Sequence, residues 1–139
     1  MGNIGYLREA LAILAQDAAP DHRRIRLLLR SASCWCRIDR ESFRVRGQGE
    51  AIEVGPAQRA RNALRVETTA DAILRLVDGR QSLEAALASN DLLIFGNARS
   101  LLLLASMCDI FMKAALRSRR LQDHFDAYRA WAGRARLPP

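Results

Sequence analysis

The hydrophobic positions at the start of the chain follow a helical period. Apolar side chains recur every three or four residues over about residues 3–16, namely at Ile4, Leu7, Leu11 and Leu14. The stretch from Ala18 to Asp21, which contains a proline, ends this pattern. The sequence therefore predicts a helix over about residues 3–16.

The period changes in the next stretch. Apolar and basic residues alternate from Arg24 to Arg30, with Ile25, Leu27 and Leu29 on one side and Arg24 and Arg26 on the other. Alternation of this kind is typical of a strand with one buried face. We therefore predict a strand here, with a helix that begins at Asp21 as the alternative.

Four further stretches alternate in the same way and are separated by turn residues such as Gly47–Glu50 and Gly55-Pro56. Their apolar positions are Cys34, Cys36 and Ile38, then Phe43 and Val45, then Ile52 and Val54, then Leu64 and Val66. This pattern predicts an antiparallel meander. We expect the helices to cover its apolar face and the arginines to lie on the wetter face, namely Arg24, Arg26, Arg44, Arg46 and Arg65.

The second half of the chain is mainly helical in pattern. Thr69 and Ser82 are candidate N-caps of two short helices, and Gly79 is a candidate end of the first. An apolar strand over 91–97 follows, and then a helix over about 98–117. A last helix over about 118–133 carries an aromatic stripe, namely Leu121, Phe125, Tyr128 and Trp131. That stripe predicts either core packing or a lid or partner surface.

The helix over 98–117 has more apolar surface than one sheet face covers. Its polar residues fall within roughly 80° of a helical wheel, namely Arg99, Ser106, Asp109, Lys113 and Arg117. Almost all the remaining positions are apolar. The helix is therefore expected to be a central core helix, to line a cavity, or to make an oligomer contact.

Composition narrows the class of protein. The chain has 139 residues, half of them hydrophobic, and a net charge of +7 with Lys113 as its one lysine. This length predicts a single domain over residues 1–139. The arginines are scattered and few aromatics lie among them, so nucleic-acid binding is disfavoured. Arg8 and Glu9 interrupt any signal-peptide apolar core, and three cysteines fit free thiols, so we expect a cytoplasmic location.

No set of catalytic side chains is evident. Cys34 and Cys36 share a strand face, but this spacing is poor for zinc without a nearby histidine, so neither a metal nor a cofactor is predicted. His22 is expected to be solvated in a turn, and His124 is expected on the polar side of the last helix. No nucleophile, base and orienting group can be combined from these residues.

The order of elements from residue 23 to 116 resembles the sterol carrier protein type 2 family, in particular its bacterial members. The matching segments are Leu64–Glu67, Leu76–Gly79, Ala85-Ala86, Leu92–Asn97 and the apolar run from Leu101. Two features depart from the family pattern: Ser89–Asp91 lacks the usual glycine, and the first and last helices lie outside the matching region. The resemblance implies an α/β (α+β) fold, with an antiparallel sheet of about five strands, helices on one face and an apolar tunnel.

The resemblance further implies a non-catalytic carrier of a hydrophobic ligand, such as a lipid, fatty acyl, isoprenoid or polyketide-like molecule. The alternative is a small enzyme or accessory biosynthetic subunit that holds its substrate in the same cavity. The predicted tunnel walls are Phe43, Val45, Leu64, Leu76, Leu87, Phe95, Leu103, Met107 and Phe111. We expect an anionic membrane or an acidic protein as a candidate partner of the arginine-rich sheet face. A homo-oligomer of this chain is a further candidate assembly.

Overall fold

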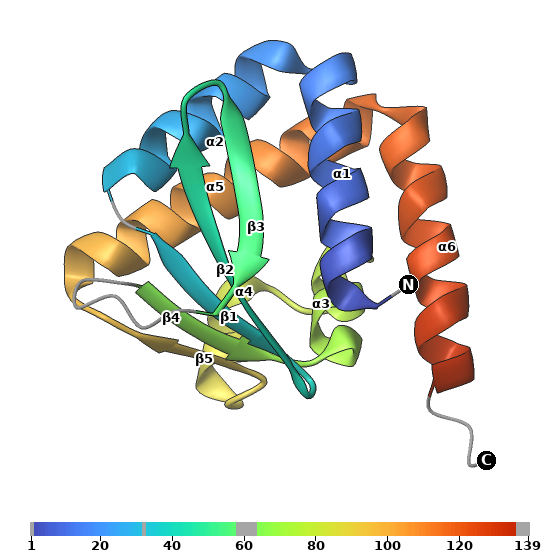
Figure 1. The fold of residues 1–139 in the computed structure, drawn as a ribbon. Coiled ribbons are helices and arrows are strands. Elements are labelled where there is room, and N and C mark those ends of the chain that lie inside the picture. The colour runs from blue at the N-terminus through green and yellow to red at the C-terminus, as the bar shows by residue number, and fades with distance from the viewer. Residues whose placement is uncertain (1, 32, 58–63, 136–139) are drawn as a thin grey trace.

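The computed structural model describes residues 2–31, 33–57 and 64–135, and these residues form one five-stranded sheet and six helices (Figure 1). Along the chain the elements are α1 (Asn3–Asp17), α2 (Ala19–Ser31), β1 (Cys34–Ile38), β2 (Glu41–Gln48), β3 (Ala51–Pro56), β4 (Leu64–Thr68), α3 (Ala70–Val77), α4 (Leu83–Ala88), β5 (Leu92–Phe95), α5 (Ala98–Arg117) and α6 (Arg119–Ala135). The predicted mixture of helices and one sheet is confirmed.

The sheet is mixed, with strand order β3-β2-β1-β4-β5. β1, β2 and β3 form the predicted antiparallel meander, and β5 is antiparallel to β4. β4, however, runs parallel to β1, with Cys34 beside Leu64 and Ile38 beside Thr68. The prediction of a wholly antiparallel sheet is therefore wrong at this pair. Alternation shows which face a side chain occupies, but it carries no information on strand direction.

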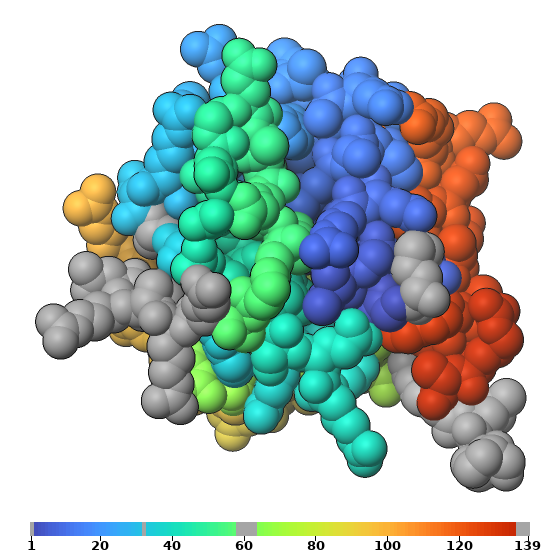
Figure 2. Space-filling view, in the orientation of Figure 1, coloured from blue at the N-terminus to red at the C-terminus, as the bar shows by residue number. Residues whose placement is uncertain are grey.

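The two faces of the sheet differ as predicted for β2 and β4. Phe43 and Leu64 are buried on the inner face, and Val66 is buried beside them. Arg44 and Arg65 lie one residue along from buried neighbours and so point to the outer face. Figure 2 shows β2 and β3 at the front of the molecule, with no described helix in front of them.

The segment predicted as a first strand is a helix, α2. Ile25 and Leu29 are its buried residues, one helical turn apart, whereas Leu27 is 45% exposed. The alternative prediction of a helix is therefore correct, although the helix begins at Ala19 and not at Asp21. The alternation was misleading because a long arginine side chain can lie along the protein surface and still bring its charged end to water. Arginines can therefore occupy a helix position beside the buried face.

Because of this change, Arg24 and Arg26 lie on α2 and not on the sheet. Arg26 Nη1 donates to the backbone oxygen of Glu50 at 2.9 Å, and Arg30 Nη2 donates to that of Gly49 at 2.7 Å. These bonds attach α2 to the turn between β2 and β3. Gly47 lies where the helix crosses β2, and a Cβ atom at this position would overlap the carbonyl oxygen of Arg26. The crossing therefore requires glycine.

The first and last helices pack beside each other at one end of the sheet (Figure 1). Asn3 donates to Glu41 Oε1 through its backbone N at 2.9 Å and its Nδ2 at 3.0 Å, which ties α1 to β2. The Tyr128 hydroxyl donates to Asn3 Oδ1 at 2.6 Å. These bonds join α1, α6 and the sheet through a small polar network.

His124 is buried, and its predicted place on the polar side of the last helix is wrong. Its Nε2 lies 2.7 Å from the carbonyl oxygen of Tyr6, so this nitrogen carries the proton and donates it. The predicted stripe of α6 does pack into the protein: Leu121 and Tyr128 are buried, and Phe125 and Trp131 pack half-buried against the buried clusters. His22, expected in a turn, lies within α2, where burial and the charge of Arg26 lower its pKa.

The predicted caps in the second half are confirmed. Thr69 and Ser82 each accept a hydrogen bond of 3.1 Å from the backbone N of the third residue along, at the starts of α3 and α4. Gly79 has a φ of 70°, the left-handed conformation that ends a helix readily at glycine. These local signals place β5 and α5 where the sequence predicts them.

Candidate hydrophobic ligand site

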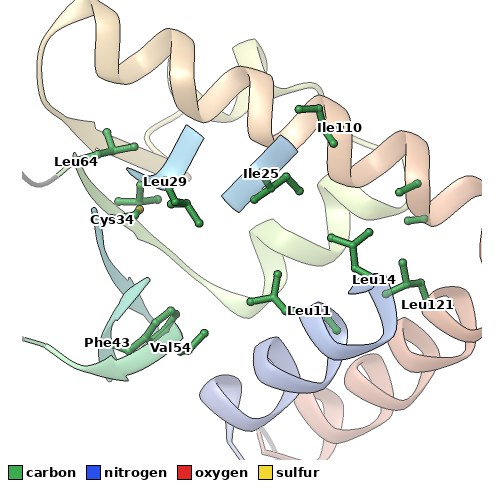
Figure 3. Close-up of a cluster of buried hydrophobic side chains, with 14 of the residues drawn as sticks. Leu11, Leu14, Ile25, Leu29, Cys34, Phe43, Val54, Leu64, Ile110 and Leu121 are labelled. Atoms are coloured by element: carbon green, nitrogen blue, oxygen red, sulfur yellow. The ribbon is translucent and has the colours of Figure 1, made fainter. Parts of the chain in front are cut away.

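The floor of the candidate site is the inner face of the sheet. Phe43 is 0% exposed and Leu64 is 1% exposed, and they come from β2 and β4 on either side of β1. Cys34 on β1 and Val54 on β3 are buried in the same cluster (Figure 3). Four neighbouring strands therefore present one continuous apolar surface.

Helices α2 and α5 cover this floor. Ile25 and Leu29 of α2 and Ile110 of α5 belong to the same buried cluster (Figure 3). The two helices run in opposite directions, because Arg117 near the end of α5 forms an ion pair of 3.0 Å with Asp21 near the start of α2. Their buried sides therefore lie along each other over the sheet.

Most of the predicted wall residues come together here. Phe43 and Leu64 are members of the buried cluster, and five others pack against it half-buried, namely Val45, Leu76, Leu87, Met107 and Phe111. On α5 it is Leu104 that packs against this cluster, while Leu103 is half-buried outside it. The tunnel that these residues are predicted to line stays a prediction.

Phe95 lies away from the other predicted wall residues. It is 50% exposed, and it pairs across the strands with Arg65, whose guanidinium lies 5.6 Å from its ring centroid. It therefore occupies the outer face of the sheet, whereas Leu92 and Ile94 point inward. A wholly apolar strand has no alternation, so the sequence alone gave no sign of its orientation.

The first three turns of α5 are apolar but poorly covered. Its buried residues are Ile110, Ala114 and Ala115, all in the second half of the helix. Leu104 and Met107, on the inward side of the first half, are only partly buried. The polar edge predicted for this helix is exposed, and Lys113 pairs with Asp109 at 3.0 Å. The uncovered part of α5 is thus its apolar beginning.

Three thiols lie in or beside this cluster, namely Cys34, Cys36 and Cys108. The Sγ atoms of Cys34 and Cys36 lie 3.3 Å apart and share a hydrogen bond, which together with burial raises the pKa of Cys36. Burial, helped by the neighbouring Cys34, raises the pKa of Cys108 to about 11. The Cys36 and Cys108 thiols therefore stay protonated at neutral pH, and the thiolate is the nucleophilic form.

The chemistry of the site is therefore apolar. The buried members of the cluster carry no charged side chain. Within the described ranges no three histidine, cysteine or acidic residues converge on a metal position. Nor is any described helix long and apolar enough to span a bilayer. Such a surface recognises ligands through shape and apolar area.

Sequence reasoning missed the contribution of the outer helices. Leu11 and Leu14 of α1 and Leu121 of α6 are buried in the same cluster as the sheet residues, at one end of it (Figure 3). The stripe that predicted the first helix contains Leu11 and Leu14, but a stripe does not show which surface it packs against. Ile25 and Leu29 were recognised as inward-facing but assigned to a strand.

Solved structures with this arrangement include two proteins of low identity. One is "UbiJ-SCP2 Ubiquinone synthesis protein", with a TM-score of 0.54 and 17% identity over 72% of this chain and 82% of that chain. Another is Sterol Carrier Protein 2 from Yarrowia Lipolytica in its apo form, with a TM-score of 0.54 and 15% identity over 80% of this chain and 88% of that one.

No protein-family model matches the sequence, and no curated protein matches it. At these identities, likeness to solved structures bears on the fold. The predicted resemblance is confirmed at that level: this chain has a sterol-carrier-protein-2-like fold.

Proposed function

We propose that the chain binds and carries a hydrophobic small molecule between the inner face of the sheet and α5. The ligand class is a lipid, fatty acyl, isoprenoid or polyketide-like molecule. Its contacts are the half-buried side chains around the cluster, above all Val45, Met107 and Phe111. The names of the two similar structures support a hydrophobic cargo, because one is called a sterol carrier and the other a ubiquinone synthesis protein.

The observation that carries this proposal is the uncovered apolar start of α5. Between Ala98 and Asp109 no residue of the helix is buried as a whole, and its inward side presents the half-buried Leu104, Met107 and Cys108. A core helix would have these side chains closed off by the protein itself. Here a bound apolar molecule would complete their burial, and methionine is well suited to pack against ligands of different shape.

The charges and thiols fit this role better than a catalytic one. The buried His124 donates a hydrogen bond from its Nε2 to the carbonyl oxygen of Tyr6, so this nitrogen is not available as a base. The thiols of Cys36 and Cys108 have raised pKa values and are therefore weak nucleophiles near neutral pH. All three cysteines are free, which suits a reducing compartment such as the cytoplasm.

The test uses a bulky side chain placed in the proposed ligand space. Met107→Trp is compared with Leu116→Trp, which adds the same bulk to a residue of the same helix that is 76% exposed. Binding of a fluorescent fatty acid is followed through the ligand's own emission, and thermal unfolding is measured on each variant. We expect Met107→Trp to weaken fatty-acid binding about tenfold or more with little loss of stability, while Leu116→Trp binds like the parent.

A close-packed core predicts the opposite result. In that case Met107→Trp destabilises the fold by about 1–3 kcal/mol through overpacking, and the parent protein takes up no fatty acid. Equal binding of the fluorescent fatty acid by the parent and by Met107→Trp would place the ligand elsewhere in the protein.

A further inference from the structure

Exposed large apolar side chains are concentrated at one corner of the molecule. Six such residues are exposed among those described, and four of them fall within ten residues, namely Leu93, Phe95, Leu101 and Leu102. We call these four residues the β5–α5 corner. The other two are separate: Leu27 lies on α2 and Leu116 near the far end of α5.

Local structure explains why this corner protrudes. β5 is an edge strand of four residues, and Leu93 and Phe95 occupy its outward-pointing positions. Asn97 then caps α5 by accepting a hydrogen bond of 2.9 Å from Ser100 N, so only two residues separate the strand from the helix. Its first turns present Leu101, 38% exposed, and Leu102, 68% exposed, at the edge of the sheet.

Cations outnumber acidic side chains around the corner. From Leu92 to Cys108 the chain contains no acidic residue, and Arg99 is exposed within this stretch. Arg65 lies over Phe95, with its guanidinium 5.6 Å from the ring centroid. Glu67, opposite Leu93 in the sheet, is already paired with Arg65 at 3.0 Å and Arg37 at 3.5 Å. The corner is thus apolar with an excess of cations.

We propose that the β5–α5 corner docks onto the surface of an anionic lipid bilayer. Its four apolar side chains enter the boundary between headgroups and acyl chains, and Arg99 and Arg65 contact anionic headgroups. The net charge of +7 favours the same approach. The proposal deepens the proposed function and rests on it: the inward side of the same stretch of α5 faces the ligand site, so cargo would reach that site from the membrane.

The size of the corner argues against a stable dimer of this chain. Even at the ~200 Å² that an aromatic side chain can bury, four side chains exposed by about half present roughly 400 Å². A stable protein interface needs about 800 Å² from each partner. A bilayer has no such requirement, because a few inserted side chains and basic residues act together in reversible binding.

The experiment is flotation of the purified protein with vesicles, either of zwitterionic lipid alone or with about one third of anionic lipid. Leu102→Ser is compared with Leu116→Ser, since both leucines are exposed on α5 but only Leu102 lies in the corner. Arg99→Gln is compared with Arg23→Gln, since both arginines are exposed. We expect about tenfold weaker binding to anionic vesicles for Leu102→Ser and about fivefold for Arg99→Gln. Both controls should bind like the parent.

Equal flotation with both kinds of vesicle, or equal effects of Leu102→Ser and Leu116→Ser, would overturn the proposal. A further contradicting result is a dimer of the parent in sedimentation without vesicles that Leu102→Ser abolishes. The corner would then contact a second copy of the chain and not a membrane. Fatty-acid binding without vesicles is measured in parallel. A parent protein that binds fatty acid but does not float with anionic vesicles refutes the corner alone. A parent protein that floats with them but binds no fatty acid refutes the proposed carrier function alone.

Discussion

At the scale of single residues, Cys108 shows how the environment of the cluster changes ordinary chemistry. The thiol is on α5, and burial raises its pKa to about 11, with a further contribution from Cys34. The sequence correctly indicated free cysteines without a catalytic or metal pattern. It could not indicate the pKa, because the burial of Cys108 depends on how α5 packs against β1.

This pKa predicts a dependence of stability on pH. Below about pH 9 the thiol is protonated in both the folded and the unfolded chain, so it has no effect on the free energy of unfolding. Between pH 9.0, its usual pKa, and about 11 the unfolded chain loses this proton while the folded chain keeps it. The free energy of unfolding should therefore fall across this range, by about 2–3 kcal/mol from this thiol.

Urea unfolding of the parent and of Cys108→Ala at pH 8 and pH 11 measures the effect. The variant should lose less stability than the parent between the two pH values, because it lacks the thiol whose proton the folded chain retains. An identical loss in the two proteins would show that the Cys108 thiol is not buried in the folded chain.

At the scale of elements, the pattern of apolar residues in α2 predicted which side chains face inward but not whether the segment is a strand or a helix. The inward direction of Ile25 and Leu29 is correct for either a strand or a helix, since four residues complete about one helical turn and two strand periods. The choice was decided by tertiary contacts, in particular the bonds from Arg26 and Arg30 to the turn after β2.

The same limit applies to β5 and β4. The orientation of β5 depends on which apolar face the rest of the protein covers, and the direction of β4 depends on how the chain returns to β1. The starts of α3 and α4 were predictable, because Thr69 and Ser82 accept hydrogen bonds from backbone groups three residues along. Capping signals were therefore reliable, whereas the orientation of β5 and the direction of β4 depend on contacts with distant residues.

The crossing of α2 over β2 predicts the effect of a single methyl group. Gly47→Ala places its Cβ against the carbonyl oxygen of Arg26, so the helix must move away from the strand. We expect a loss of about 1–3 kcal/mol in the free energy of unfolding. The control is Gly133→Ala in α6, where the added Cβ meets nothing within 4 Å. It should stabilise the helix by up to ~1 kcal/mol.

Chemical unfolding of the two alanine variants beside the parent gives both values. A Gly47→Ala protein as stable as the parent would mean that α2 does not lie this close to β2 in solution.

At the scale of the whole molecule, the sheet and helices form an apolar site that the protein covers incompletely. The inner face of the sheet is closed by α2 and by the second half of α5, with α1 and α6 at one end. The first half of α5 leaves Leu104 and Met107 only partly buried and carries exposed leucines at the β5–α5 corner. Under the two proposals above, the hydrophobic ligand would lie beside the surface that contacts the membrane.

The central claim is that this chain carries a hydrophobic small molecule, and a native mass spectrum tests it most directly. The protein is purified from its own source without detergent, so that any bound molecule is retained. We predict a species heavier than the 15.5 kDa chain by the mass of one hydrophobic molecule, which organic solvent extracts and which returns when that lipid is added back. A spectrum of the bare chain alone, unchanged after incubation with lipids extracted from that source, would contradict the account.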